Sequence, residues 1–225
     1  NFRPIIRKIE NPIKAPVREK TILSEEQLLK LLKELHKRGK NERACLVALA
    51  AYSGRRKAEL LRFKVSDFDD CNVVYGSLYR TPRQIRTKGR GTNGKMLTCY
   101  TLAKPFRPWF DNWMDERTQK GIDSEWLFPD PSNPKMPRTI AAISGWTDEF
   151  SKIIGEEVYL HSFRHMACTR MVQAGIPTNV VQEIFGWSSP DMVDIYSDID
   201  MSDEIGKYFK DGEIVAPDKK TLSDL

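Results

Sequence analysis

Three short segments of the chain carry side chains that suit chemistry on a phosphate. The first is the run Gly54-Arg55-Arg56-Lys57, where a glycine turn leads into a short helix expected over residues 57–63. Cations at a helix N-terminus oppose the helix dipole, and a bound anion would relieve that repulsion. Free main-chain N–H groups and an arginine side chain together can bind phosphate. An exposed charge cluster without a ligand is the alternative interpretation.

The second segment is the sequence HSFRH that begins at His161, in a helix expected over residues 161–174. Spacings of three and four residues place His161, Arg164 and His165 on one helix face. Histidine can exchange a proton near neutral pH and arginine can bind phosphate oxygens. Cys168 continues the same face, which leaves zinc as an alternative, but a structural zinc site needs four ligands and no fourth is suggested. A purely structural role is the other alternative.

The third segment runs from Gly186 and Trp187 to Tyr196, at the end of a short helix expected over residues 190–196. A tyrosine can act as a nucleophile when neighbouring groups remove its proton. A tyrosine at a helix end is more often a packing or surface residue, so the local sequence does not distinguish Tyr196.

The elements that position these segments are expected to be mainly helical. A capping-box pattern at Ser24 and Gln27 predicts a helix that ends at Gly39. Turn residues and β-branched runs predict strands over 73–79, 84–87 and 96–102 with a hairpin tip at 89–94. Further helices are expected over 41–52, 105–121, 139–154, 177–185 and 202–209, and a loop over 129–137. The predicted fold class is mainly α with a small three-stranded antiparallel β-sheet (α+β).

An aromatic stripe in the helix expected over 105–121 has helical spacing. Its members are Phe106, Trp109, Phe110, Trp113 and Met114. Such a stripe is more typical of a protein core than of a surface on which bases stack.

Composition and charge narrow the class of protein. The chain has 225 residues, 40% of them hydrophobic and 30% charged, and its net charge is +5. No apolar run approaches the roughly 20 residues that span a bilayer, so we expect no membrane partner. The four cysteines form no C-x-x-C pair, which fits a reducing intracellular compartment.

The charges are unevenly distributed along the chain. Residues 76–110 contain eight basic residues and no Asp or Glu, which favours a phosphate-facing surface. Residues 198–225 contain eight acidic residues and four lysines. We expect a basic linker or arm over residues 1–20, one domain over 21–209 and an acidic tail over 210–225.

Together with Thr87-Lys88-Gly89 on the expected hairpin, the three segments resemble, in order and spacing, the tyrosine recombinase (integrase) family of enzymes that break and rejoin DNA. The matching motifs are Gly54-x-Arg56-x-x-Glu59-Leu60 closed by Asp67 and Asp69, Thr87-Lys88-Gly89, His161-x-x-Arg164-His165, and Gly186-Trp187-Ser188-Ser189. Tyr196 follows Trp187 by nine residues and Arg164 by thirty-two, as the nucleophile of the family does. Ser24-Glu25-Glu26-Gln27 resembles the usual opening of the catalytic domain.

The resemblance implies a fold, a site and a reaction. The catalytic residues that it implies are Arg56, Lys88, His161, Arg164, Trp187 and Tyr196. The DNA- or phosphate-binding residues expected beside them are Arg55, Arg83, Arg86, Arg90, Lys95 and His165. No metal ligand and no cofactor are implied. The product of strand cleavage would be a 3′-phosphotyrosyl link.

Three positions of the implied site need comment. Trp187 stands where many family members have histidine, and an indole N–H can donate a hydrogen bond but cannot transfer a proton. We therefore expect a positioning role for it. Lys95, across the hairpin from Lys88, could supply the lysine charge instead. Tyr208 is the next candidate nucleophile after Tyr196.

The resemblance also implies partners. They are double-stranded DNA recombination sites and further copies of the chain, as a homotetramer on DNA and a monomer in isolation. We expect a cytoplasmic protein acting on nucleoid or host-cell DNA, and the diverged 129–137 region favours a mobile-element integrase of archaeal or viral type. The alternatives are a type IB topoisomerase-like enzyme and an inactive DNA-binding regulator.

Overall fold

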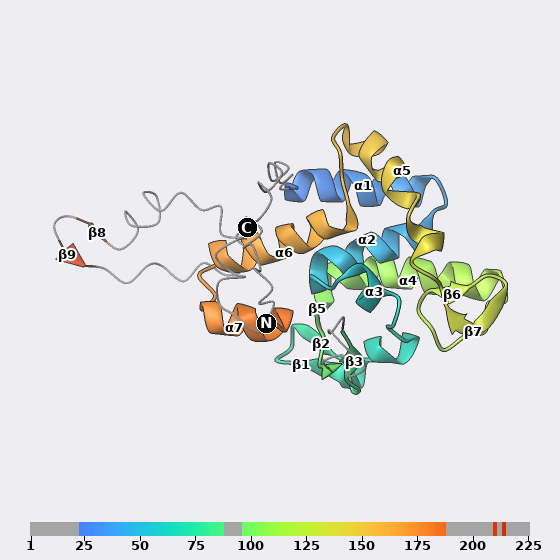
Figure 1. Ribbon diagram of the computed structural model, residues 1–225, viewed down its shortest axis with the longest axis horizontal. Coiled ribbons are helices and arrows are strands. Elements are labelled where there is room, and N and C mark those ends of the chain that lie inside the picture. The colour runs from blue at the N-terminus through green and yellow to red at the C-terminus, as the bar shows by residue number, and fades with distance from the viewer. Residues whose placement is uncertain (1–22, 88–95, 188–208, 211–212, 215–225) are drawn as a thin grey trace, which may run out of the picture.

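The computed structural model describes residues 23–87, 96–187, 209–210 and 213–214 (Figure 1). Its α-helices are α1 (Glu25–Lys37), α2 (Asn41–Ser53), α3 (Lys57–Leu60), α4 (Ala103–Gln119), α5 (Trp146–Ile154), α6 (Leu160–Gln173) and α7 (Thr178–Phe185). Short 3-10 helices are η1 (Val65–Phe68), η2 (Asp70–Asn72) and η3 (Ala141–Ile143). The predicted fold class, mainly α with a small three-stranded antiparallel β-sheet, is confirmed, and two-stranded sheets accompany that sheet. No helix among the described residues is long and apolar enough to cross a bilayer.

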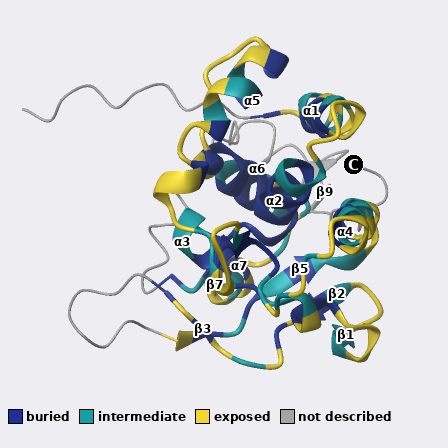
Figure 2. Ribbon diagram, turned by 90° about the vertical axis from the view of Figure 1, so that its right-hand side faces the viewer, coloured by how far each residue is buried: buried dark blue, intermediate teal, exposed yellow. Residues whose placement is uncertain are grey.

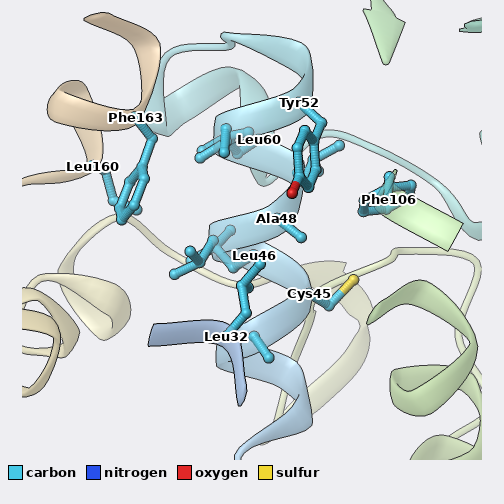
Figure 3. Packing of buried hydrophobic residues seen from close by; sticks show 14 of the residues in the cluster. Leu32, Cys45, Leu46, Ala48, Tyr52, Leu60, Phe106, Leu160 and Phe163 are labelled. Atoms are coloured by element: carbon cyan, nitrogen blue, oxygen red, sulfur yellow. The ribbon is translucent and has the colours of Figure 1, made fainter. Parts of the chain in front are cut away.

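Helix α2 forms the centre of the molecule. All of its residues after Arg43 are buried, as expected for a helix that is apolar on every side. Helices α1, α4 and α6 pack around it, and Figure 2 shows α2 and α6 as the buried interior. Leu32 of α1, Phe106 of α4 and Phe163 of α6 reach this core (Figure 3).

The capping box predicted at the start of α1 is confirmed. The Gln27 N–H donates to Ser24 Oγ at 3.1 Å, and the Ser24 N–H donates to Gln27 Oε1 at 2.9 Å. A cap of this kind stabilises a helix by about 1 kcal/mol. The aromatic stripe of α4 is also confirmed as core, because Phe106, Phe110 and Trp113 are buried.

The sheet differs from the prediction. A three-stranded antiparallel sheet forms in the order β1 (Val73–Val74), β2 (Leu78–Arg80), β5 (Tyr100–Leu102), and β3 (Ile85–Arg86) pairs separately with β4 (Met96–Leu97). The single strand expected over 73–79 is wrong because Tyr75 and Gly76, at φ 55° and 65°, make a tight turn inside it. The hairpin pairing Ile85 with Leu97 agrees with the prediction, while its tip lies outside the described residues.

Two further segments correct the prediction. Residues 129–137 form a two-stranded antiparallel hairpin, β6 (Pro129–Asp130) and β7 (Asn133–Pro137), rather than a loop. The helix expected over 139–154 divides into η3 and α5. The helix expected over 190–196 lies outside the described residues. Of that expected over 202–209 only Phe209 is described, and it lies in β8 (Phe209–Lys210), which pairs with β9 (Glu213–Ile214).

Candidate active site

The turn between α2 and α3 begins at Gly54, which ends α2 in the left-handed conformation with φ 62°. A Cβ at this position would lie 2.6 and 2.7 Å from two ring carbons of Phe185 in α7. The backbone conformation and the close approach of α7 therefore both require glycine. The turn and the end of α7 are packed directly on each other.

Arg56 follows in an extended conformation at the start of α3. Its main-chain N–H donates to Glu59 Oε2 at 2.9 Å, and its guanidinium pairs with Glu59 Oε1 at 3.3 Å. The Glu59 side chain is only 1% exposed, whereas that of Arg56 is 33% exposed. A buried carboxylate thus holds a guanidinium that reaches the surface. Because α3 has only four residues instead of the predicted seven, its dipole adds little to anion binding.

Arg55 is fully buried, which corrects the expectation that it binds phosphate. Its Nε donates to the carbonyl oxygen of Ser53 at 3.2 Å, and one Nη donates to that of Ile184 in α7. The other Nη lies 3.8 Å from Cys99 Sγ. The two adjacent side chains therefore differ in environment, since Arg55 lies inside the protein and Arg56 is 33% exposed. The Arg55 guanidinium binds main-chain carbonyl groups inside the protein.

Arg164, in α6, joins the first and third motifs. One Nη donates to the carbonyl oxygen of Gly54 at 2.5 Å and the other to that of Phe185 at 3.3 Å. The Cζ atom lies 4.6 Å from the Phe185 ring centroid and 5.0 Å from that of Trp187. The side chain is fully buried. The HxxR motif therefore holds the turn that carries Arg56.

His161 and His165 lie next to each other near the start of α6. Their ring centroids are 4.7 Å apart with the rings perpendicular. Partial desolvation lowers the pKa of His161, and the positive charges of Arg164 and Arg56 lower it further. Arg56 and His161, far apart in sequence, are thus close enough in the fold for the charge of one to act on the other. A neutral imidazole able to accept a proton is favoured there.

Trp187 packs against Arg164 and Phe185. Its side chain is buried and stacks on Phe185 with centroids 4.7 Å apart and an interplanar angle of 24°. Its main-chain N–H donates to the carbonyl oxygen of Gln182 at 3.0 Å. This arrangement fits the positioning role expected for the indole.

The β3–β4 hairpin is held by arginines that bond to main-chain carbonyls. Arg83 Nη2 lies 3.1 Å from the buried Asp67 carboxylate and also donates to the carbonyl oxygen of Arg62. The Arg62 side chain in turn donates to the carbonyl oxygen of Arg86. Leu97, on β4, lies against Gly186. Arg83, expected at the DNA surface, is thus part of an ion pair that fixes the hairpin.

Lys88, Arg90, Lys95 and Tyr196 lie outside the described residues. Arg86 is exposed on β3, and His165 is half-buried. The structural roles of Arg62 and Arg55 were missed. No sequence pattern signals them, because their partners are main-chain atoms of segments distant in the chain.

The described part of the site holds a surface guanidinium, a buried one beneath it, and an imidazole beside both. The guanidiniums can stabilise negative charge on a phosphate and the imidazole can accept a proton. The described side chains include no group of three or more His, Cys, Asp or Glu residues placed to hold a metal ion.

Solved structures of recombinases share the fold of this chain. The crystal structure of XerA recombinase matches with a TM-score of 0.64 at 22% identity, over 86% of this chain and 65% of that one. A lambda integrase tetramer bound to a Holliday junction matches with a TM-score of 0.55 at 17% identity, over 82% of this chain and 50% of that one. These likenesses show a shared fold.

The chain belongs to the phage integrase family, whose sequence model matches residues 21–203. Tyrosine recombinase XerA of Pyrococcus furiosus is 28% identical over 193 residues, which are 84% of this chain and 61% of that protein. The resemblance to tyrosine recombinases is thereby confirmed. The chain spans less than two thirds of the length of this relative.

Proposed function

We propose that this chain is the part of a site-specific DNA recombinase that cleaves and rejoins strands. The observation that carries the proposal is the convergence of Arg164 on the turn that bears Arg56, with the charges of both arginines acting on His161. Family membership and the similarity to tyrosine recombinase XerA support the same reaction.

In the proposed reaction the phenol oxygen of Tyr196 attacks the scissile phosphorus. His161 accepts or directs the phenol proton, because a tyrosine of ordinary pKa near 10 is a poor nucleophile at neutral pH. Arg56, at the surface, donates to the non-bridging oxygens as their negative charge grows, and Arg164 adds positive charge from beneath. Lys88, or Lys95 in its place, gives a proton to the departing 5′ oxygen.

The step forms a 3′-phosphotyrosyl bond and breaks the 3′-phosphate to 5′-oxygen bond. Since one phosphodiester replaces another, a 5′ hydroxyl can reverse the step without a nucleotide or metal. A hydroxyl from another strand would complete an exchange, by which we propose that a mobile element is integrated or excised in nucleoid or host-cell DNA.

A nicked suicide DNA substrate tests the nucleophile. The wild-type chain and Tyr208→Phe are expected to form a covalent protein–DNA adduct that migrates slowly on a denaturing gel. Tyr196→Phe is expected to form none. An adduct with Tyr196→Phe, or its absence with Tyr208→Phe alone, would show that the assigned nucleophile is wrong.

We further propose that the chain is monomeric alone and forms a homotetramer on paired DNA sites. The solved lambda integrase described as a tetramer on a Holliday junction supports this proposal. Mass photometry should detect one copy without DNA and four with a synthetic junction that carries the target sites. Persistent 1:1 complexes on the junction would contradict it.

A further inference from the structure

The end of α7 receives hydrogen bonds from both main-chain and side-chain donors. A helix leaves its last four carbonyl groups without partners inside the helix. In α7 the Trp187 N–H donates to Gln182 O at 3.0 Å and the Gly186 N–H donates to Glu183 O at 3.1 Å. These two main-chain bonds form a Schellman motif. The carbonyl groups of residues 184 and 185 receive no main-chain hydrogen bond from this motif.

Two buried arginines supply the missing donors. Arg55 donates to the carbonyl oxygen of Ile184, and Arg164 donates to that of Phe185 at 3.3 Å. Both guanidiniums also lie over the Phe185 ring, with Cζ 5.8 and 4.6 Å from its centroid. Positive charge at a helix C-terminus is stabilising because it opposes the negative end of the dipole.

The two arginines come from different elements. Arg164 belongs to α6, whereas Arg55 directly precedes Arg56 in the α2–α3 turn. The Arg55 Nε bond to Ser53 O at 3.2 Å fixes the same guanidinium to the end of α2. One side chain therefore joins the turn that carries Arg56 to the helix end that leads to Trp187 and onward to Tyr196.

We infer that Arg55 is a positioning residue for strand cleavage, which sets the end of α7 relative to Arg56. This role rests on the proposed function and assigns a purpose to a side chain that cannot itself reach phosphate. Lysine cannot replace it, since one ammonium lacks the planar fork that bonds Ser53 and Ile184 together. Arg55→Lys should keep the charge and lose the geometry.

Arg117 provides a matched control. It is buried in α4, and its guanidinium donates to the carbonyl oxygens of Ser124, Trp126 and Leu127. Arg117→Lys thus removes the same kind of interaction from a different part of the fold. A general loss of stability would affect both variants alike.

The test measures single-turnover cleavage of suicide DNA at saturating concentration, DNA affinity, and amide hydrogen exchange of Gly186 and Trp187. Arg55→Lys should cleave at least about tenfold more slowly at unchanged affinity, because misplacement by about 1 Å can cost 10²-fold. It should also exchange both amides faster. Arg117→Lys should keep the wild-type cleavage rate and the wild-type amide exchange, even where its free energy of unfolding equals that of Arg55→Lys. Arg55→Gln, with a planar donor, should recover part of the exchange protection if Arg55→Lys is poorly folded.

Equal loss of cleavage in the two lysine variants, or unchanged exchange at Gly186 and Trp187 in Arg55→Lys, would overturn the inference. A wild-type chain that forms no adduct would instead refute the proposed function. The exchange rates would still decide whether Arg55 fixes the end of α7.

Discussion

Arg55 and Arg56 are adjacent and chemically identical, yet the α2–α3 turn gives them opposite environments. Arg56 keeps a third of its side chain exposed and pairs with a buried carboxylate. Arg55 is buried without a carboxylate partner among the described residues, and carbonyl oxygens replace its lost water. Burying a charge is costly unless such acceptors surround it. The run of basic residues predicted a charged turn, but only contacts with α7 decide which guanidinium faces the surface.

The protonation of His161 can be predicted from the same geometry. Partial desolvation and the charges of Arg164 and Arg56 place its pKa below the ordinary value of about 6.5. At a pH where an ordinary histidine is half-protonated, a larger fraction of His161 is therefore neutral and able to accept a proton. It stabilises the fold above its unfolded pKa, and that contribution disappears as the pH falls through the lowered folded pKa.

Proton NMR of the imidazole rings measures this shift directly. His161 should titrate below the ordinary value in the wild-type chain, and Arg56→Gln should raise its pKa because one of the repelling charges is gone. The chain has only three histidines, so the resonances can be assigned by single substitutions. A His161 pKa that is ordinary, or indifferent to Arg56→Gln, would contradict the arrangement.

Gly54 should be more sensitive to substitution than an ordinary turn glycine. Gly54→Ala introduces a left-handed alanine, which costs about 1–2 kcal/mol, and a Cβ overlapping the Phe185 ring, which adds about 1–3 kcal/mol. Gly39 has the same conformation, φ 65°, but a Cβ placed there would meet no atom within 4 Å. Urea unfolding should therefore show a larger loss for Gly54→Ala than for Gly39→Ala. Similar losses would mean that α7 moves aside.

At the scale of elements, the β3–β4 hairpin depends on a buried ion pair. Burial raises the pKa of Asp67, and the Lys64 N–H and the Arg83 charge counteract that effect. Asp67→Ala removes the acceptor of the Lys64 N–H and of the Arg83 guanidinium. Each lost hydrogen bond to a charged group lowers the free energy of unfolding by about 1.5–3 kcal/mol. The Arg83 side chain is 33% exposed, so screening by water reduces the contribution of its ion pair to the free energy of unfolding.

Asp70 provides the control for this ion pair. It pairs with Arg107 at 2.7 Å but is 84% exposed, so Asp70→Ala should cost less than about 1 kcal/mol. Urea unfolding of the two variants measures the difference. Equal, small losses would show that the Asp67 pair does not hold the hairpin.

Helices were predictable where a local signal defines their limits. The capping box fixes the start of α1, and Gly54 and Gly186 end α2 and α7. The sheet was less predictable, because Tyr75 adopts a positive φ that its β-prone sequence does not indicate. The motifs predicted Arg56, His161 and Arg164 as site residues, and in the structure Arg164 binds the turn that carries Arg56. Their burial and the role of Arg55 depend on tertiary contacts, which no short pattern encodes.

At the scale of the molecule, the basic stretch over 76–110 is not one uniform surface. Arg107 is neutralised by Asp70 and Asp111 and also donates to the Tyr79 hydroxyl at 2.9 Å. Arg80 is exposed in β2 and lines a shallow hollow with Arg83 and Gln84. The sequence of the stretch, which contains no acid, therefore suggests a stronger positive potential than the fold provides, because Asp70 and Asp111 from outside it pair with Arg107.

The salt dependence of DNA binding separates these two arginines. If DNA lies across the hollow, Arg80 releases a counterion from phosphate, and Arg80→Gln should reduce the slope of log K against log[salt] by roughly 0.9. Arg107→Gln should change the slope much less, because its charge is already paired. Fluorescence anisotropy with a duplex over a series of NaCl concentrations measures both slopes. A larger change for Arg107→Gln than for Arg80→Gln would place the DNA against α4 instead of the hollow beside β2.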